Sequence, residues 1–165
     1  MTFKTFFWSF LTTLLILTML YFIRINLIDV NDMSIEYLYA GDNEIYPTVV
    51  RKITIDKVGN GLISINNEKY ETMAETFKID EKTMKQLKSI IKMNGFLFLK
   101  NLFENKMCSD GRSSTIIIKN SDKEFGVKTY CTDNLIFKNT ENALIAAIGE
   151  SRINQFVSNI KIKDV

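Results

Sequence analysis

An uncharged apolar run near the N-terminus constrains this chain more than any other feature. The residues from Thr5 to Ile23 carry no charge. A helix of this length rises roughly 28 Å at about 1.5 Å per residue, close to the ~30 Å hydrocarbon thickness of a bilayer. We therefore expect residues 1–26 to form one transmembrane signal anchor, contacting lipid through residues 5–23. A tether at 27–32 and a single domain at 33–165 would follow.

The residues that flank the run bear on its orientation and its fate. Lys4 precedes the run and Arg24 follows it, so the difference in flanking positive charge is small. We expect a single-pass protein of the cytoplasmic or plasma membrane, with the N-terminus inside and the C-terminal domain outside, in the periplasm or extracellular space. A cleaved signal peptide is the alternative, but it needs a shorter apolar region that ends in small residues. The bulky end of this run, Leu20–Ile23, favours an uncleaved anchor.

Hydroxyl side chains gather on one side of the anchor helix. On a helical wheel Thr5, Ser9, Thr12 and Thr13 share a face. Such a face allows close helix packing and interhelical hydrogen bonds, so it is a candidate surface for self-association. The alternative is that each hydroxyl bonds back to a carbonyl of its own helix.

Composition excludes several classes of function. Beyond the anchor, 19 Lys and Arg face 19 Asp and Glu, so the domain lacks the basic excess that nucleic acid binding requires. The chain has no histidine, which removes Ser-His-Asp and Cys-His catalysis. Two cysteines are too few for a structural zinc site. We expect no metal and no cofactor.

The two cysteines, Cys108 and Cys131, form the second informative feature. An outward-facing domain lies where disulfides form and persist, so we expect the pair to be bonded. Closure of this loop would stabilise the fold by roughly 3 kcal/mol. A redox or nucleophilic role for either thiol is the alternative, although no C-x-x-C spacing or neighbouring histidine supports it.

Residue periodicity beyond the anchor predicts an α+β domain, with an antiparallel sheet of five to seven strands packed by two helices. The expected helices are Glu81–Met93, capped by Asp80, and Thr140–Ile148, capped by Asn139 or Thr140. Periodicity does not decide between helix and strand for residues 151–163. Expected strands cover residues 34–39, 48–56, 62–66, 70–77, 113–119, 124–131 and 135–138.

Two groups of side chains are candidates for a partner surface. Phe96, Phe98 and Phe103 lie in a strongly apolar segment that is either core or an exposed docking patch. Four lysines share one side of the first domain helix and form either an ordinary solvated face or a contact for acidic groups or lipid headgroups. These lysines are Lys82, Lys85, Lys88 and Lys92.

The sequence shows no catalytic constellation, so we expect a non-enzymatic, membrane-anchored interaction module with a protein partner. A narrower alternative is an immunity or inhibitor protein that neutralises a toxin or enzyme outside the membrane. The remaining alternative is a small hydrolase that uses Asp, Glu, Ser or Lys. Glu71 and Glu75 share one side of an expected strand, but spacing alone does not form a pair of catalytic carboxylates.

Overall fold

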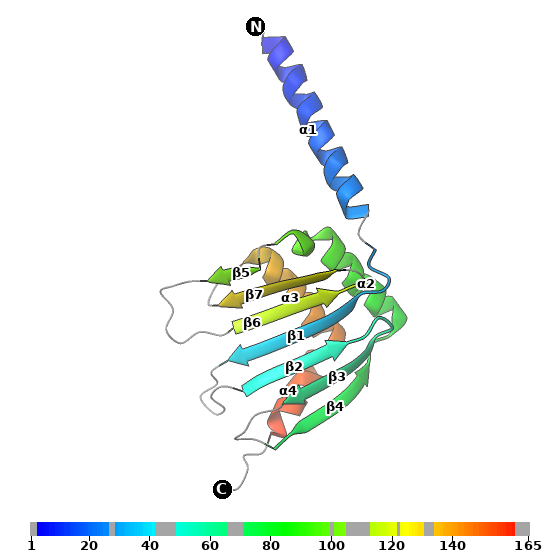
Figure 1. The fold of residues 1–165 in the computed structure, drawn as a ribbon, viewed down its shortest axis with the longest axis vertical. Coiled ribbons are helices and arrows are strands. Elements are labelled where there is room, and N and C mark those ends of the chain that lie inside the picture. The colour runs from blue at the N-terminus through cyan, green and yellow to red at the C-terminus, as the bar shows by residue number, and fades with distance from the viewer. Residues whose placement is uncertain are drawn as a thin grey trace.

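The computed structural model describes residues 3–26, 29–41, 49–65, 71–99, 101–104, 113–121, 123–130 and 134–160. An N-terminal helix leads into one α+β domain (Figure 1). The elements in chain order are α1 (Phe3–Asn26), β1 (Ser34–Gly41), β2 (Val49–Ile55), β3 (Asn60–Ile65), β4 (Met73–Lys78), α2 (Glu81–Met93), the 3-10 helix η1 (Phe96–Phe98), β5 (Leu102–Glu104), β6 (Ser113–Lys119), β7 (Glu124–Tyr130), α3 (Leu135–Ile148) and α4 (Glu150–Ser158).

The domain is built on one seven-stranded sheet in the order β4-β3-β2-β1-β6-β7-β5. The five pairings along β4-β3-β2-β1-β6-β7 are antiparallel, as the sequence predicts. The edge strand β5 runs parallel to β7, with Leu102 opposite Lys128, so the sheet is mixed and the prediction of a purely antiparallel sheet is wrong. The three residues of β5 were not predicted as a strand, because a strand this short depends on its pairing with β7 and not on its own periodicity.

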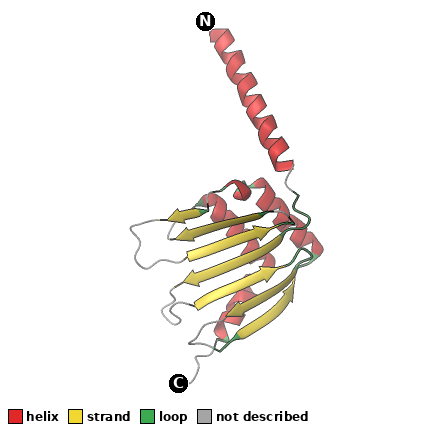
Figure 2. Ribbon diagram, viewed as in Figure 1, coloured by secondary structure: helices red, strands yellow, loops and turns green. Residues whose placement is uncertain are grey.

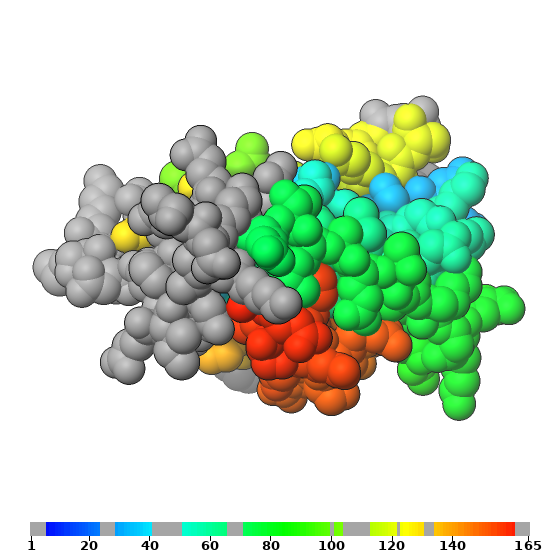
Figure 3. Space-filling view, turned by 90° about the horizontal axis from the view of Figure 1, so that it is seen from below, coloured from blue at the N-terminus to red at the C-terminus, as the bar shows by residue number. Residues whose placement is uncertain are grey.

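Helices α2, α3 and α4 all pack on one face of the sheet. Figure 3, viewed from the end opposite α1, shows the orange and red helices beneath the cyan and yellow strands. Alternate strand residues point into this layer, and the largest side chains that are fully buried include Ile53, Ile63, Ile116, Phe96 and Phe156. Burial of each such side chain contributes roughly 1.5–3 kcal/mol, so this interface is the source of most of the stability.

Turn residues set the hairpins where the sequence predicts them. Gly59, between β2 and β3, has a φ of 86°, and a Cβ there would approach the carbonyl oxygen of Ile79 to 2.7 Å. The turn between β6 and β7 joins Lys119 and Glu124, which lie opposite each other across the hairpin.

The structure confirms helix α2 at its predicted bounds. The side chain of Asp80 accepts a hydrogen bond from the backbone N–H of Thr83 and caps the helix. Asn94 ends it, and Gly95 follows with a φ of 84°.

The C-terminal half differs from the prediction in one place. The expected strand 135–138 is the first turn of α3, and the cap is Asn134, whose side chain accepts from the N–H of Phe137. Neither Asn139 nor Thr140 caps this helix. The apolar run Leu135–Phe137 resembles a strand in isolation, but Phe137 is buried against Phe96 at a ring-centroid distance of 6.2 Å. Of the segment 151–163, for which periodicity does not decide between helix and strand, residues 151–158 belong to α4, so three helices cover the sheet instead of two.

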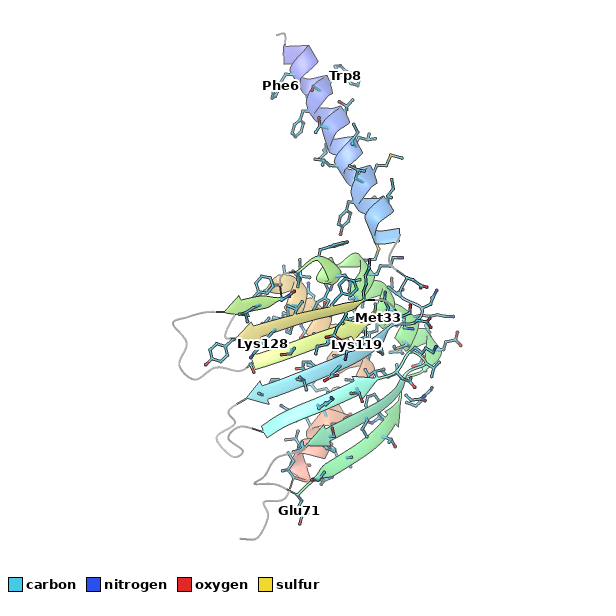
Figure 4. The ribbon with its side chains drawn as sticks, viewed as in Figure 1. Phe6, Trp8, Met33, Glu71, Lys119 and Lys128 are labelled. Atoms are coloured by element: carbon cyan, nitrogen blue, oxygen red, sulfur yellow. The ribbon has the colours of Figure 1, made fainter. Side chains whose placement is uncertain are left out.

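Helix α1 stands away from the domain (Figure 2). Its window Phe6–Ile23 is long and apolar enough to cross a membrane, with a mean hydropathy of 2.0 and no part of it buried. Phe6 and Trp8 lie near its free end, far from the sheet (Figure 4).

Candidate functional site

The predicted phenylalanine surface is largely core. Phe96 has no exposed area and packs among the helices, so it cannot form part of a surface. Phe103 is half-buried and packs against the same core. Phe98 is also half-buried, and its ring lies 6.3 Å from that of Tyr21 in α1. The core alternative therefore holds for Phe96 and Phe103, and Phe98 contacts the end of α1.

The four lysines of the predicted lysine face also differ in their exposure. Lys82 and Lys85 are exposed and Lys92 is half-buried, but Lys88 is buried, with 9% of its surface exposed. Its position follows from the helix period, because it lies between the buried residues Leu87 and Ile91. The prediction of four lysines on one surface is therefore wrong for Lys88.

Lys88 holds together two segments that are distant in sequence. Its ammonium group donates hydrogen bonds to the backbone carbonyls of Asn31, at 2.7 Å, and of Lys57, at 2.9 Å. Burial lowers the pKa of Lys88, while the carboxylates of Asp32 and Asp29 oppose that shift. We call this arrangement the tether clamp, formed by Asp29, Asn31, Asp32, Lys57, Lys88 and Asn120.

Two further contacts complete the tether clamp. Lys57 forms an ion pair with Asp32 at 3.3 Å, and the side-chain amide of Asn120 donates to the carbonyl of Asp29 at 3.3 Å. Residues 29–32 are thus bonded to the domain. The second part of the predicted short tether, residues 29–32, therefore contacts the domain.

Two threonines of the predicted hydroxyl face of α1 bond within their own helix. Thr12 donates to the carbonyl of Trp8 at 3.0 Å, and Thr13 donates to that of Ser9 at 2.8 Å. The side chain of Thr5 lies outside the described residues, as do Cys108 and Cys131. The disulfide stays a prediction.

The most extensive candidate site is the face of the sheet that α2, α3 and α4 leave uncovered, which we call the open face. It faces the viewer in Figure 1, and Figure 4 labels Lys119 and Lys128 on it. Strand alternation places the side chains, since the neighbours of each open-face residue on the same strand point into the core. The described open-face residues include Ser34, Glu36, Leu38, Lys52, Thr54, Leu62, Ser64, Thr115, Ile117, Lys119 and Lys128.

A row of charges crosses the middle of the open face. Glu36 pairs with Lys52 at 2.9 Å and approaches Lys119 at 4.0 Å, while Lys119 also pairs with Glu124 at 3.3 Å. Beside this row a shallow depression of about 380 Å³ is lined by Ser34, Thr54 and Leu62, among others.

Apolar side chains lie next to these charges. Ile117 is directly opposite Glu36 across β1 and β6, and Leu38 is its diagonal neighbour. Leu62, on β3, is 37% exposed. The open face therefore combines half-exposed aliphatic groups with fixed charges, a combination found in protein interfaces.

A second concave site lies on the helix side of the sheet. A groove of about 370 Å³ runs between β1, β2 and the helices α3 and α4. In it the hydroxyl of Tyr37 donates to the carboxylate of Glu141 at 2.7 Å, and the guanidinium of Arg51 lies 4.3 Å from the ring centroid of Tyr39. Burial, and secondly the charge of Glu141, raise the pKa of Tyr37.

Sequence reasoning missed both the open face and this groove. The alternation of Ile35, Tyr37 and Tyr39 with Ser34, Glu36 and Leu38 separates two faces of a strand. That pattern does not say which other elements cover either face.

The described residues contain no cluster of three or more acidic, histidine or cysteine side chains that would hold a metal ion. The sequence matches no protein-family model and no curated protein, so the geometry above is the only guide to function.

Proposed function

We propose that this protein is a membrane-anchored, outward-facing interaction module that binds a protein partner through the open face of its sheet. Helix α1 holds the domain at the cytoplasmic or plasma membrane, and the domain carries out no catalysis. The main support for the proposal is the open face itself. It presents Leu38, Leu62 and Ile117, and none of the described helices covers it.

The open face has the dimensions of one side of a protein interface. Seven strands about 4.8 Å apart, with a mean length of about six residues, extend over roughly 29 by 20 Å. The projected area of roughly 600 Å² is of the same order as the ~800 Å² that each partner contributes to a stable complex. One solvated face is common in antiparallel sheets, and a sheet this wide leaves a correspondingly large surface for a partner.

The charge row adds specificity to this surface. Because Glu36 is held between Lys52 and Lys119, its position is defined before any partner arrives. A partner with complementary charges is favoured, and like charges opposite the row are disfavoured. Leu38 and Ile117 supply the apolar area that becomes buried on docking.

The narrower form of this proposal is an immunity or inhibitor protein, whose partner is a toxin or enzyme arriving from outside. The domain has no net charge beyond the anchor, so such capture depends on shape and apolar contact more than on electrostatic steering. Deletion of the protein should then sensitise cells to neighbours that release the toxin. Unchanged survival in such a co-culture argues against this form and leaves the broader proposal in place.

The test of the open face is site-specific photocrosslinking in intact cells. A photoreactive residue at Ile117 should give one protein adduct of defined mass, and Leu38→Asp in the same chain should abolish that adduct by removing apolar contact. The matched control carries the photoreactive residue at Gln86, which is exposed on α2 in the helix layer.

Unchanged thermal unfolding of the Leu38→Asp variant ensures that loss of the adduct reflects binding and not misfolding. The same adduct from Gln86 and Ile117, or no adduct from Ile117, would contradict docking on the open face.

A further inference from the structure

The edge of the domain nearest to α1 carries exposed apolar side chains. Three segments form this membrane-proximal edge: η1, β5 and the first turn of α3. In Figure 1, η1 and β5 lie along the upper edge of the domain, the edge towards α1, whereas β4 lies at the lower edge. Leu102 of β5 is 53% exposed and Leu135 of α3 is 71% exposed, and both are large aliphatic side chains without cover from the described residues.

One contact joins the membrane-proximal edge to α1, and two more join its segments to the rest of the domain. The ring of Phe98 in η1 lies 6.3 Å from that of Tyr21, near the end of the apolar window of α1. The first turn of α3 adjoins η1, because a Cβ on Gly95 would lie 4.0 Å from the side chain of Ile136. Next to β5, the N–H of Lys128 in β7 donates a hydrogen bond to the carbonyl of Asn101, the residue before β5, at 2.9 Å.

The tether clamp prevents this edge from moving far from the end of α1. The carbonyls of Asp29 and Asn31 are bonded to Asn120 and Lys88, so only residues 27 and 28 lie between α1 and the clamped segment. The chain spans at most about 3.6 Å per residue, so the Cα atoms of Asn26 and Asp29 lie no more than roughly 11 Å apart. If the window Phe6–Ile23 occupies the hydrocarbon core, the edge is placed at the headgroup layer.

The chemistry of the edge suits that layer. Aromatic and aliphatic side chains such as Phe98, Leu102 and Leu135 favour the boundary between headgroups and acyl chains. Two exposed lysines accompany them: Lys128 lies opposite Leu102 in the sheet, and Lys138 lies one turn after Leu135. Lysines at this depth favour anionic lipid headgroups.

We propose that the membrane-proximal edge is a second, peripheral lipid contact, by which the domain rests against the bilayer that α1 spans. The occupant is the lipid surface itself, and no protein partner is needed to cover Leu102 and Leu135. This inference rests on the proposed anchoring by α1, and the experiment below separates the two.

The test uses tryptophan fluorescence of the full-length protein in vesicles of phosphatidylcholine and phosphatidylglycerol, with and without bromine on the acyl chains. Trp8 is the only tryptophan of the chain and lies in α1, so the unaltered protein reports anchoring. In a Trp8→Phe background, Leu135→Trp reports the edge. Glu71→Trp is the matched control, because Glu71 is exposed at the far end of the domain (Figure 4).

Brominated lipid should quench Trp8 and the tryptophan at position 135, and should leave the tryptophan at position 71 unchanged. The emission of the tryptophan at position 135 should also shift to shorter wavelength when the protein is transferred from buffer to lipid vesicles. Quenching at position 8 without quenching at position 135 overturns the edge contact and leaves the anchor intact. Without quenching at position 8, the anchor fails and the edge contact fails with it.

Discussion

Lys88 illustrates how one buried charge connects the segment after α1 to the domain. Its hydrogen bonds to the carbonyls of Asn31 and Lys57 join the segment after α1 to the turn between β2 and β3. Lys88 lies beside the buried Leu87 on α2, and the carbonyls of Asn31 and Lys57 satisfy its ammonium group there, which the lysine spacing alone does not predict.

Replacement of Lys88 by Ala should lower the free energy of unfolding by about 1–3 kcal/mol, because two carbonyls lose a charged donor. Urea unfolding measures the change. Lys85→Ala is the matched control, since Lys85 is exposed and pairs only with the exposed Glu81 among the described contacts. That exposed pair should contribute little to stability, because water screens its two charges. Equal losses in the two variants would show that the clamp contributes nothing.

Tyr37 should make the domain sensitive to alkali. Burial raises its pKa above the ordinary value of about 10, so above that pH the unfolded chain loses the phenolic proton while the folded chain keeps it. The stability of the wild type should therefore be unaffected by this group below about pH 10 and should fall above it, by up to about 1.4 kcal/mol per pH unit. Tyr37→Phe removes this dependence but retains every other titrating group. Parallel stability curves for the two proteins in alkaline urea titrations would refute the assignment.

At the scale of elements, the sequence predicts those helices and turns whose ends are set by nearby residues. Asp80 and Gly95 bound α2, and Asn120 and Lys123 set the β6–β7 turn, so both elements follow from the sequence. The start of α3 does not, because the burial of Phe137 against Phe96 is a tertiary contact. The strand β5 exists only through its pairing with β7, which no local pattern encodes.

The pairing of β7 with its two neighbouring strands bears on the predicted disulfide between Cys108 and Cys131. Tyr130 pairs with Glu104 on one side and with Ser113 on the other, and Cys131 follows it directly. Cys108 lies in the segment 105–112 that joins those two partners of Tyr130. We expect mass spectrometry after alkylation to show two modified thiols only when the protein is first reduced. Modification of both thiols without a reductant would disprove the bond.

At the scale of the whole molecule, the sequence predicts α1 and the fold class but does not predict the candidate site. Length and hydropathy are enough to predict α1, because spanning requires only an apolar helix of sufficient length. The α+β class follows from alternating strands and capped helices. The candidate site does not follow, since the open face is defined by the face of the sheet to which α2, α3 and α4 do not pack.

The orientation of the sheet relative to α1 has a consequence for how encounters occur. In Figure 1, α1 runs in the plane of the picture while the sheet is seen face-on. If α1 spans a bilayer as proposed, the sheet stands perpendicular to the membrane plane and the open face points along that plane. Partners confined to the same membrane search in two dimensions at high local concentration. This orientation would then favour partners embedded in the same membrane over molecules that diffuse freely in solution.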